Sequence, residues 1–306
     1  MVLSIRVARA RLRLMRVRAR RLQLRYVTDW GWKQLIVLSS ISAFLILLLI
    51  AVFTVREGLP AFAKVGLWRL LSGTAWDVAE SEFGILPMIL GSIFVTLGAL
   101  VMGVPLGVGC AVFLAEVAPR RARDLLRPAI ELLVGIPSVV YGLVGMLVLV
   151  PLVGKLGGSG DSVLAASIVL SVMVLPTITT ISEDSIRAVP QAYREGSLAL
   201  GATHWQTVWR VVLPAARSGI VASIILGMGR AIGETMAMIM VIGNSIIIPT
   251  SPLSPARTLT GTLALELKYA AGLHWNALFA TGAVLFVFIL VLNSLALIVH
   301  RRAVAR

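Results

Sequence analysis

The amino-acid sequence predicts an all-α membrane protein with about six transmembrane helices and both termini in the cytoplasm. Hydrophobic residues make up 58% of the 306-residue chain, and its mean hydropathy is +0.94. A soluble domain cannot bury that much apolar surface. Several apolar runs reach the roughly 20 residues that a helix needs to cross a hydrocarbon core of about 30 Å. The sequence lacks the short alternating segments of a membrane β-barrel, so helices are expected.

Six apolar runs define the topology. The first, residues 35–55, contains no charged residue, and the others lie within residues 85–114, 128–150, 162–181, 216–243 and 278–299. If the chain starts in the cytoplasm, cytoplasmic segments hold 21 of the 28 Lys and Arg residues and external segments hold six. This positive-inside asymmetry is typical of a multi-pass protein of the cell (inner or plasma) membrane. The net charge of +14 therefore reflects topology, and no nucleic-acid partner is expected.

The first 34 residues form a basic segment before the first span. Apolar residues and arginines both recur there at steps of mostly three or four, which predicts an amphipathic helix with an arginine flank. Such a helix can lie on the anionic cytoplasmic leaflet and gain about 1 kcal/mol per basic residue near the surface. The alternative is a disordered basic tail that only enforces the topology.

The residues of this chain predict no catalytic centre and no metal site. Cys110 is the single cysteine, and the three histidines have no ligand spacing. A nucleotide-binding loop needs a glycine five residues before its Gly-Lys pair and a Ser or Thr after it. The pair Gly154-Lys155 is followed by Leu156 and lacks that earlier glycine. We therefore expect this chain to bind no cofactor.

Small residues and a proline mark the second and third spans. Gly103 and Gly107 are four residues apart, a spacing that favours close helix packing. The third span is expected to open at Pro128 and contains Pro137 followed by Ser138. Pro137 should kink this helix or break it locally. Broken helices often line a pathway, but a kink used only for packing is equally compatible with the sequence.

Arg230 and Glu234 are the charged residues expected near the middle of a span. An arginine at the bilayer centre costs at least about 2.5–3.5 kcal/mol, so it normally faces protein or a wet cavity. Four residues apart on a helix, the two side chains can pair. One interpretation is a structural ion pair that neutralises itself. The other is that Arg230 offers its planar guanidinium to a tetrahedral oxyanion, while Glu234 orients it.

The longest internal cytoplasmic segment is residues 182–215. Thr203 is a suitable N-cap for a short helix over 203–212, and Pro214 is expected to stop that helix. Trp205 and Trp209 are four residues apart and should share one face. A short helix in an exposed loop needs a surface to pack against, either a partner protein or the protein's own membrane surface.

The spacing in this segment resembles the EAA loop of ABC-importer permeases. That pattern is Glu-Ala-Ala, three residues, Gly, nine residues, Ile, one residue, Leu-Pro. The positions that match it are Glu195, Gly201, Leu213 and Pro214, while Gly196, Ser197 and Val211 replace residues of similar size. The resemblance implies a type I importer permease (MetI-like) fold and a coupling helix that docks on a separate ATPase. It implies docking roles for Glu195, Gly201, Trp205, Val211, Leu213 and Pro214.

Residues 135–142, 195–214 and 229–244 together resemble the PstC family of phosphate-transport permeases. The resemblance implies a subunit that imports inorganic phosphate past Arg230, Glu234, Pro137 and Ser138. The implied partners are a PstA-like second permease, a PstB-like ATPase dimer that binds ATP and Mg²⁺, a PstS-like external phosphate-binding protein and membrane lipids.

The resemblance also suggests a division of the chain and leaves two alternatives open. Residues 1–34 are the basic segment, residues 35–84 are the first span and an external loop, and residues 85–306 are the permease core with its coupling loop 182–215. One alternative is a permease for another oxyanion, such as sulfate or molybdate. The other is an ATP-independent channel or secondary carrier.

Overall fold

The computed structural model describes the backbone of residues 2–304 and the side chains of residues 30–298. It divides into two compact units, Met1–Phe53 and Thr54–Arg306. The helices are α1 (Val2–Lys64), α2 (Leu67–Ser72), α3 (Leu86–Val112), α4 (Arg120–Gly135), α5 (Ser138–Val144), α6 (Val150–Gly154), α7 (Val163–Arg187), α8 (Gln191–Ala199), α9 (His204–Thr207), α10 (Leu213–Gly233), α11 (Met236–Val241), α12 (Leu259–Glu266) and α13 (Leu273–Val304). Three π-helical turns, η1 (Phe113–Val117), η2 (Gly145–Leu149) and η3 (Val208–Val212), and two short strands, β1 (Trp76–Asp77) and β2 (Glu82–Phe83), complete the elements.

Within the described residues, five helices are long and apolar enough to cross a membrane, and a sixth crossing is formed if α4 and α5–α6 count as one bent span. This agrees with the six expected spans. The first span lies in Trp30–Lys64 of α1, which continues past the expected boundary near residue 55. The expected amphipathic face of residues 1–34 lies almost wholly outside the described side chains and stays a prediction.

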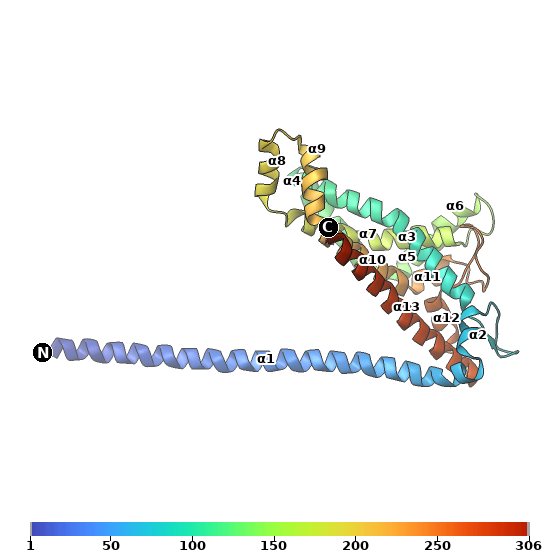
Figure 1. Ribbon diagram of the computed structural model, residues 1–306, viewed down its shortest axis with the longest axis horizontal. Helices are drawn as coiled ribbons and strands as arrows, with labels where there is room; N and C mark the ends of the chain where they lie inside the picture. The colour runs from blue at the N-terminus through green and yellow to red at the C-terminus, as the bar shows by residue number, and fades with distance from the viewer. Residues whose placement is uncertain (1, 305–306) are drawn as a thin grey trace. The chain divides into compact units, whose positions relative to one another are not determined.

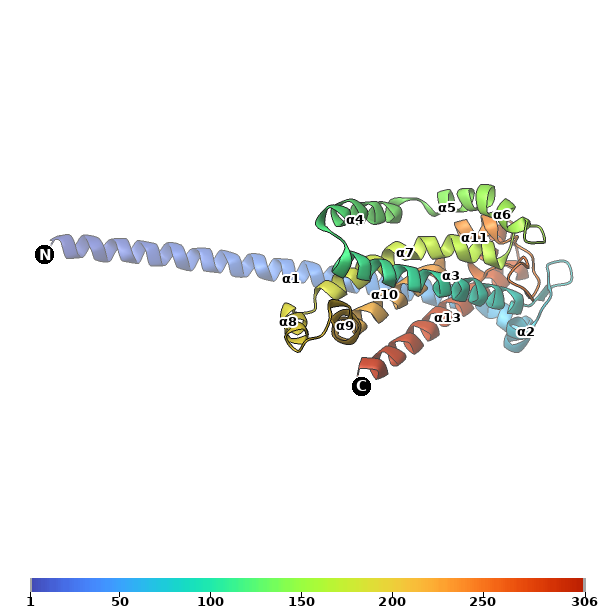
Figure 2. The same cartoon turned by 90° about the horizontal axis from the view of Figure 1, so that it is seen from above.

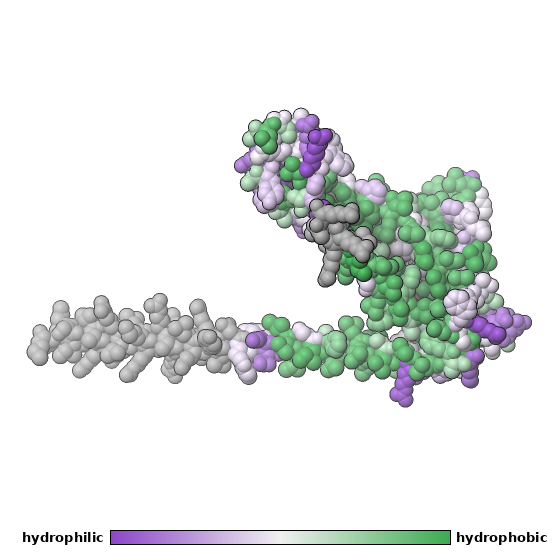
Figure 3. Space-filling view, in the orientation of Figure 1, coloured by the Kyte–Doolittle hydropathy of each residue, from purple (hydrophilic) through white to green (hydrophobic). Residues whose placement is uncertain are grey.

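The packed core of the second unit is formed by α3, α7 and α10, which lie side by side in both views (Figures 1 and 2). A β-carbon added to Gly103 would lie 3.0 Å from Val174, and one added to Gly107 would lie 2.8 Å from Ile178. The expectation that these two glycines allow close helix packing is therefore confirmed. Figure 3 shows the apolar surface of this unit between hydrophilic residues of the α8–α9 region and of the β1–β2 hairpin.

The third span is broken, as the proline predicted. Residues 120–135 and 138–154 form two helical segments bent by 96°, and Pro137 stands at the N-cap of α5 with extended backbone. The expectation that Pro128 opens this span is wrong, because α4 begins at Arg120 and contains Pro128.

A second break, which the sequence analysis did not predict, separates α10 from α11 at Glu234 and Thr235. The short helices that follow the two breaks pack on each other. A β-carbon on Gly142 of α5 would lie 2.9 Å from the Cα of Ala237 in α11. Glycine is therefore needed at position 142 for the two backbones to approach this closely.

At the end of the unit opposite α8 and α9, one carboxylate joins three elements. Glu266 accepts a hydrogen bond from Nε1 of Trp76 on β1 at 2.8 Å and lies 2.9 Å from Nε2 of His274 on α13. It also pairs with Arg257, whose Nε donates to the carbonyl oxygen of Asn244. The segment before residue 274 is therefore tied to the hairpin by a half-buried polar cluster.

Candidate functional site

Arg230 lies in the last turn of α10, which packs against α7. Its Nη1 donates a hydrogen bond to Oγ1 of Thr177 on α7 at 3.3 Å. Tyr141 donates to the carbonyl oxygen of Leu133 across the Pro137 break at 2.8 Å. Arg230 is half-buried. A guanidinium has five N–H donors, so this arrangement leaves most of them for another acceptor.

The predicted pairing of Glu234 with Arg230 is wrong. Both residues are among the described side chains, and no ion pair joins them. Instead, Oε1 of Glu234 accepts from the backbone N–H groups of Thr235 at 3.1 Å and Ala237 at 3.2 Å. The physical reason is that α10 ends at Gly233 and Glu234 has extended backbone angles (φ −69°, ψ 132°). The i,i+4 geometry requires an unbroken helix, so Glu234 caps the start of α11 instead.

The structure places Pro137 and Ser138 on the same bundle of interrupted helices as Arg230. Pro137 is the N-cap residue of α5, and Ser138 is the half-buried first residue of that helix. One turn further along α5 lies Tyr141, whose hydroxyl bonds to Leu133 across the break. Tyr141 was not among the predicted site residues.

The short helix in the cytoplasmic loop begins at the residue that the sequence predicts, Thr203. Thr203 and Gln206 form a reciprocal capping box at the start of α9, with distances of 3.2 and 2.9 Å. The rings of Trp205 and Trp209 pack edge to face with centroids 5.9 Å apart, and both side chains are more than half exposed. Gly201 has φ +85°, the left-handed conformation that glycine adopts without strain after a helix end. Glu195 is exposed on α8.

The expectation that Pro214 stops the loop helix is wrong. The chain runs from α9 through η3 directly into α10, and Pro214 stands in the first turn of α10, where its missing N–H costs little. Val208 and Val212 are buried, while Val211 and Leu213 are half-buried. The loop helix is therefore the continuous cytoplasmic start of the span that carries Arg230.

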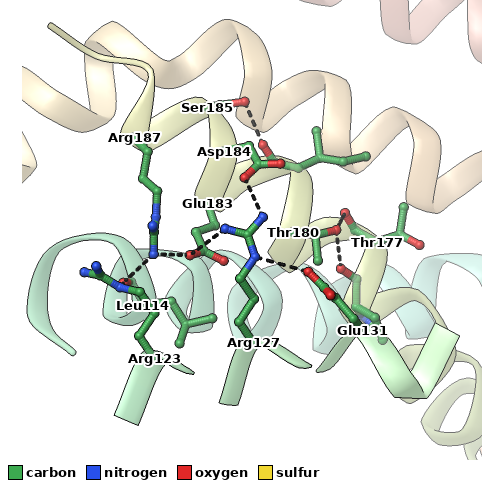
Figure 4. Close-up of polar contacts among 12 residues, drawn as sticks. Leu114, Arg123, Arg127, Glu131, Thr177, Thr180, Glu183, Asp184, Ser185 and Arg187 are labelled. Atoms are coloured by element: carbon green, nitrogen blue, oxygen red, sulfur yellow. Dashed lines mark hydrogen bonds and ion pairs between the residues drawn. The ribbon is translucent and has the colours of Figure 1, made fainter. Parts of the chain in front are cut away.

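An ion cluster at the cytoplasmic end of α7 was missed by the sequence analysis (Figure 4). Glu183 of α7 is fully buried, and it pairs with Arg187 one turn later and with Arg127 of α4 at 3.8 Å. Arg127 also lies 3.2 Å from Asp184 and 3.1 Å from Glu131. Neither oxygen of Glu183 makes an aligned hydrogen bond within the described residues, so the two guanidinium groups hold it mainly by charge.

The π-helical end of α3 contributes to the same cluster. The carbonyl oxygen of Leu114 in η1 accepts from Arg123 at 3.1 Å and from Arg187 at 3.4 Å. A π-turn shifts the backbone bonding pattern by one residue, and such turns are frequent at functional sites. Helix periodicity could have identified the pairs Glu183–Arg187 and Arg127–Glu131, which are each four residues apart. It could not have shown that Arg127 of α4 meets Glu183 of α7, because these residues are far apart in sequence.

Comparisons with known proteins agree with this architecture. The family described as "Binding-protein-dependent transport system inner membrane component" matches residues 103–305. The chain is 44% identical over 259 residues to the "Probable ABC transporter permease protein YqgH" of Bacillus subtilis, covering 81% of this chain and 84% of that protein. It is 35% identical over 296 residues to the phosphate transport system permease protein PstC of Haemophilus influenzae, covering 90% of this chain and 92% of that protein.

Solved structures of ABC transporters share the fold. A bacterial ABC transporter involved in the import of the acidic polysaccharide alginate aligns with a TM-score of 0.65 at 18% identity, covering 92% of this chain and 99% of that chain. An inward-facing MetNI methionine ABC transporter aligns with a TM-score of 0.53 at 19% identity, covering 72% and 94%. At these identities the structures support the fold alone, whereas the family match and the PstC relatives cover most of the sequence. The chain therefore belongs to the family of binding-protein-dependent transport system inner membrane components.

Proposed function

We propose that this chain is the permease subunit of an ATP-driven phosphate importer. It forms half of the translocation pathway and couples to a separate ATPase through the loop 182–215. The observation that carries the substrate class is Arg230, a half-buried guanidinium within a span whose hydrogen-bond partner is the neutral hydroxyl of Thr177. The relatives named PstC support phosphate as the substrate.

Arg230 is proposed to bind the passing anion. A planar guanidinium suits the oxygens of phosphate, and charge-assisted hydrogen bonds are about twice as strong as neutral ones. The hydroxyl group of Thr177 stands beside it on α7. Pro137 and Ser138 then shape the neighbouring wall of the pathway, and Glu234 acts by fixing the start of α11 rather than by orienting Arg230.

The coupling loop is proposed to dock on the ATPase through its exposed face. Glu195, Trp205 and Trp209 supply exposed acidic and aromatic groups. Gly201 provides the left-handed turn between α8 and α9. Val211, Leu213 and Pro214 join the docking helix to α10 without interruption. A displacement of the loop is therefore transmitted to α10, the helix that carries Arg230.

The proposed assembly contains a PstA-like second permease, a PstB-like ATPase dimer and a PstS-like external phosphate-binding protein. ATP and Mg²⁺ bind the ATPase. ATP binding closes the ATPase dimer, draws the two coupling loops together and turns the spans from inward-open to outward-open. Phosphate released by the external protein passes Arg230 and leaves into the cytoplasm after hydrolysis.

Uptake of radioactive phosphate into vesicles that contain all four kinds of subunit tests this proposal. We expect uptake that requires ATP and the external binding protein and that excess sulfate does not inhibit. Strong competition by sulfate or molybdate would overturn phosphate in favour of another oxyanion. Uptake that continues without ATP, or after replacement of both Glu195 and Gly201, would overturn the coupled importer in favour of a channel or secondary carrier.

A further inference from the structure

The helix α8, which carries the exposed Glu195, has little contact with the rest of the protein. Seven of its nine residues are exposed, and only Arg194 and Ser197 are partly shielded. Ser197 forms a hydroxyl–hydroxyl bond of 2.9 Å with Thr207 of α9, which is within the same loop. Among the described side chains of α8, Arg194 is therefore the one that joins this helix to the membrane spans.

Arg194 makes three contacts at the cytoplasmic ends of two spans. Its Nη1 donates to the carbonyl oxygen of Val189 at 2.6 Å, and its Nη2 donates to the carbonyl oxygen of Ile186 at 2.9 Å. These carbonyl groups lie in the last turn of α7 and just after it, where the carbonyl oxygen of Ile186 also accepts from the backbone N–H of Val189 at 3.3 Å. Nη2 also donates to Oε1 of Glu116 in η1, at the end of α3, at 2.7 Å. One guanidinium thus joins α8 to both α7 and α3.

Glu116 is the second half of this link. Its side chain is 7% exposed and that of Arg194 is 15% exposed. Its other oxygen, Oε2, lies 4.0 Å from Nε2 of His204, the first residue of α9. Glu116 therefore faces both helices of the loop. A cleft of about 460 Å³ lies beside these residues, lined on one side by Glu116, Arg187 and Arg194.

The apolar contacts of the loop lie elsewhere and concern η3 rather than α8. Val208 and Val212 pack with residues at the ends of α3 and α7 in one buried cluster, whose other members are Ala111, Val112, Ile186, Val189 and Ala216. This cluster holds the loop helix against the spans. It does not include any residue of α8, which packs on η3 and α9 within the loop. Arg194 supplies the side-chain bonds that join the helix of Glu195 directly to the ends of α3 and α7.

We infer that Arg194 and Glu116 are positioning residues that make α8 move as one body with α3 and α7. Removing one member of a buried charge pair leaves the other unpaired, which is costly, so the link resists extension. The inference rests on the proposed function, because it explains how displacement at Glu195 reaches two spans and not only α10. Without the bonds of Arg194, α8 changes its position relative to α3 and α7 when the ATPase displaces it. The exposed face of the loop that docks on the ATPase keeps its structure.

A distance measurement tests the link independently of transport. Spin labels are placed at Leu200, which is 91% exposed at the end of α8, and at Val101, which is 72% exposed on α3, in a Cys110→Ser background of the full chain in lipid nanodiscs. We expect a narrow distance distribution that broadens in Arg194→Gln. The matched control is Arg123→Gln, which also removes an arginine–carbonyl bond but does not touch the loop. An equal width in wild type and Arg194→Gln would overturn the inference.

A coupling measurement in the complete transporter tests the consequence. We expect Arg194→Gln to retain the ATPase in a pull-down but to lower the phosphate transported per ATP hydrolysed about ten-fold, within the usual range of allosteric coupling. Arg194→Lys should recover part of this loss because it keeps the charge. The double variant Glu116→Gln with Arg194→Gln should be no worse than Arg194→Gln alone, since both changes break one link.

The outcomes separate the link from the proposed function. Normal coupling in Arg194→Gln, or additive losses in the double variant, would overturn the link while leaving the importer intact. If wild-type vesicles show no ATP-driven phosphate uptake, the proposed function fails, and the width of the Leu200–Val101 distribution still decides whether Arg194 holds α8.

Discussion

Arg230, in the last turn of α10, and the arginines at the cytoplasmic helix ends have opposite environments. Arg230 donates to one neutral hydroxyl, and the acidic residue four positions later points away from it. Arg127, Arg187 and Arg194 each contact at least one carboxylate. All four side chains come from helices, so the difference lies in their partners and not in their secondary structure.

This difference separates a binding role from a structural role. An arginine that carboxylates already neutralise has little to offer an anion, because binding would have to displace an existing partner. An arginine held by a hydroxyl keeps its charge available, at the cost of desolvation inside the membrane. We therefore propose substrate contact for Arg230 and a structural role for the paired arginines at the cytoplasmic helix ends.

The largest expected effect comes from Arg230→Gln. This change removes the mid-span charge but keeps a side chain of similar shape that can bond Thr177. We expect phosphate uptake to fall by a factor of about 100 or more, consistent with the loss of a bonded charge pair worth roughly 3 kcal/mol. Subunit assembly, checked by co-purification, should be unchanged. Wild-type uptake in this variant would show that Arg230 does not contact the substrate. The proposed difference in role between Arg230 and the arginines paired with carboxylates would then be wrong.

The next effect concerns the buried carboxylate of the cytoplasmic cluster. Glu183→Ala leaves Arg187 and Arg127 without their shared buried partner, and breaking a buried pair costs about 3–5 kcal/mol. We expect a lower thermal midpoint and poorer recovery of the purified chain. The matched control is Asp184→Ala, because Asp184 is exposed and contacts the same Arg127. Equal stability losses in both variants would argue against a special role for the buried group.

A smaller effect is expected in the loop between α8 and α9. Gly201→Ala places a β-carbon on a residue with φ +85°, which costs about 1–2 kcal/mol. Because the loop is exposed, we expect weaker recovery of the ATPase in pull-downs while the membrane spans keep their thermal midpoint. Gly196→Ala is a suitable control, since Gly196 lies within α8 and has open space around it. If Gly201→Ala weakens ATPase docking and Gly196→Ala does not, the left-handed turn at Gly201 is needed for docking.

The smallest effect is expected for Glu234→Gln. Glutamine keeps an oxygen that can accept from Ala237, so the start of α11 should lose only a few tenths of a kcal/mol to about 1 kcal/mol. Phosphate uptake should stay within a few-fold of wild type. A loss of phosphate uptake as large as that of Arg230→Gln would show that Glu234 and Arg230 pair during the transport cycle. Arg230 would then be without a carboxylate partner in one state of the transporter only.

Local signals in the sequence accounted for much of the fold. Apolar length predicted the spans, Pro137 predicted the break before α5, and Thr203 predicted the start of the loop helix. These signals work because each depends on a short stretch of backbone: its length, its missing N–H or its capping oxygen. The prediction for Glu234 failed because the four-residue rule assumes a continuous helix, and Gly233 ends it.

What the sequence by itself determined was the number of apolar spans and the charge asymmetry that predicts their orientation, since apolar length and the placement of charges are properties of the chain alone. The docking residues of the loop 182–215 are implied by the resemblance to the EAA loop and stay a proposal. Tertiary structure alone decided which charges meet. Glu183 and Arg127, or Glu116 and Arg194, are brought together by helices distant in sequence, and no local pattern encodes that distance. The same packing left Arg230 beside a hydroxyl, because the break at Glu234 turned its expected partner toward α11.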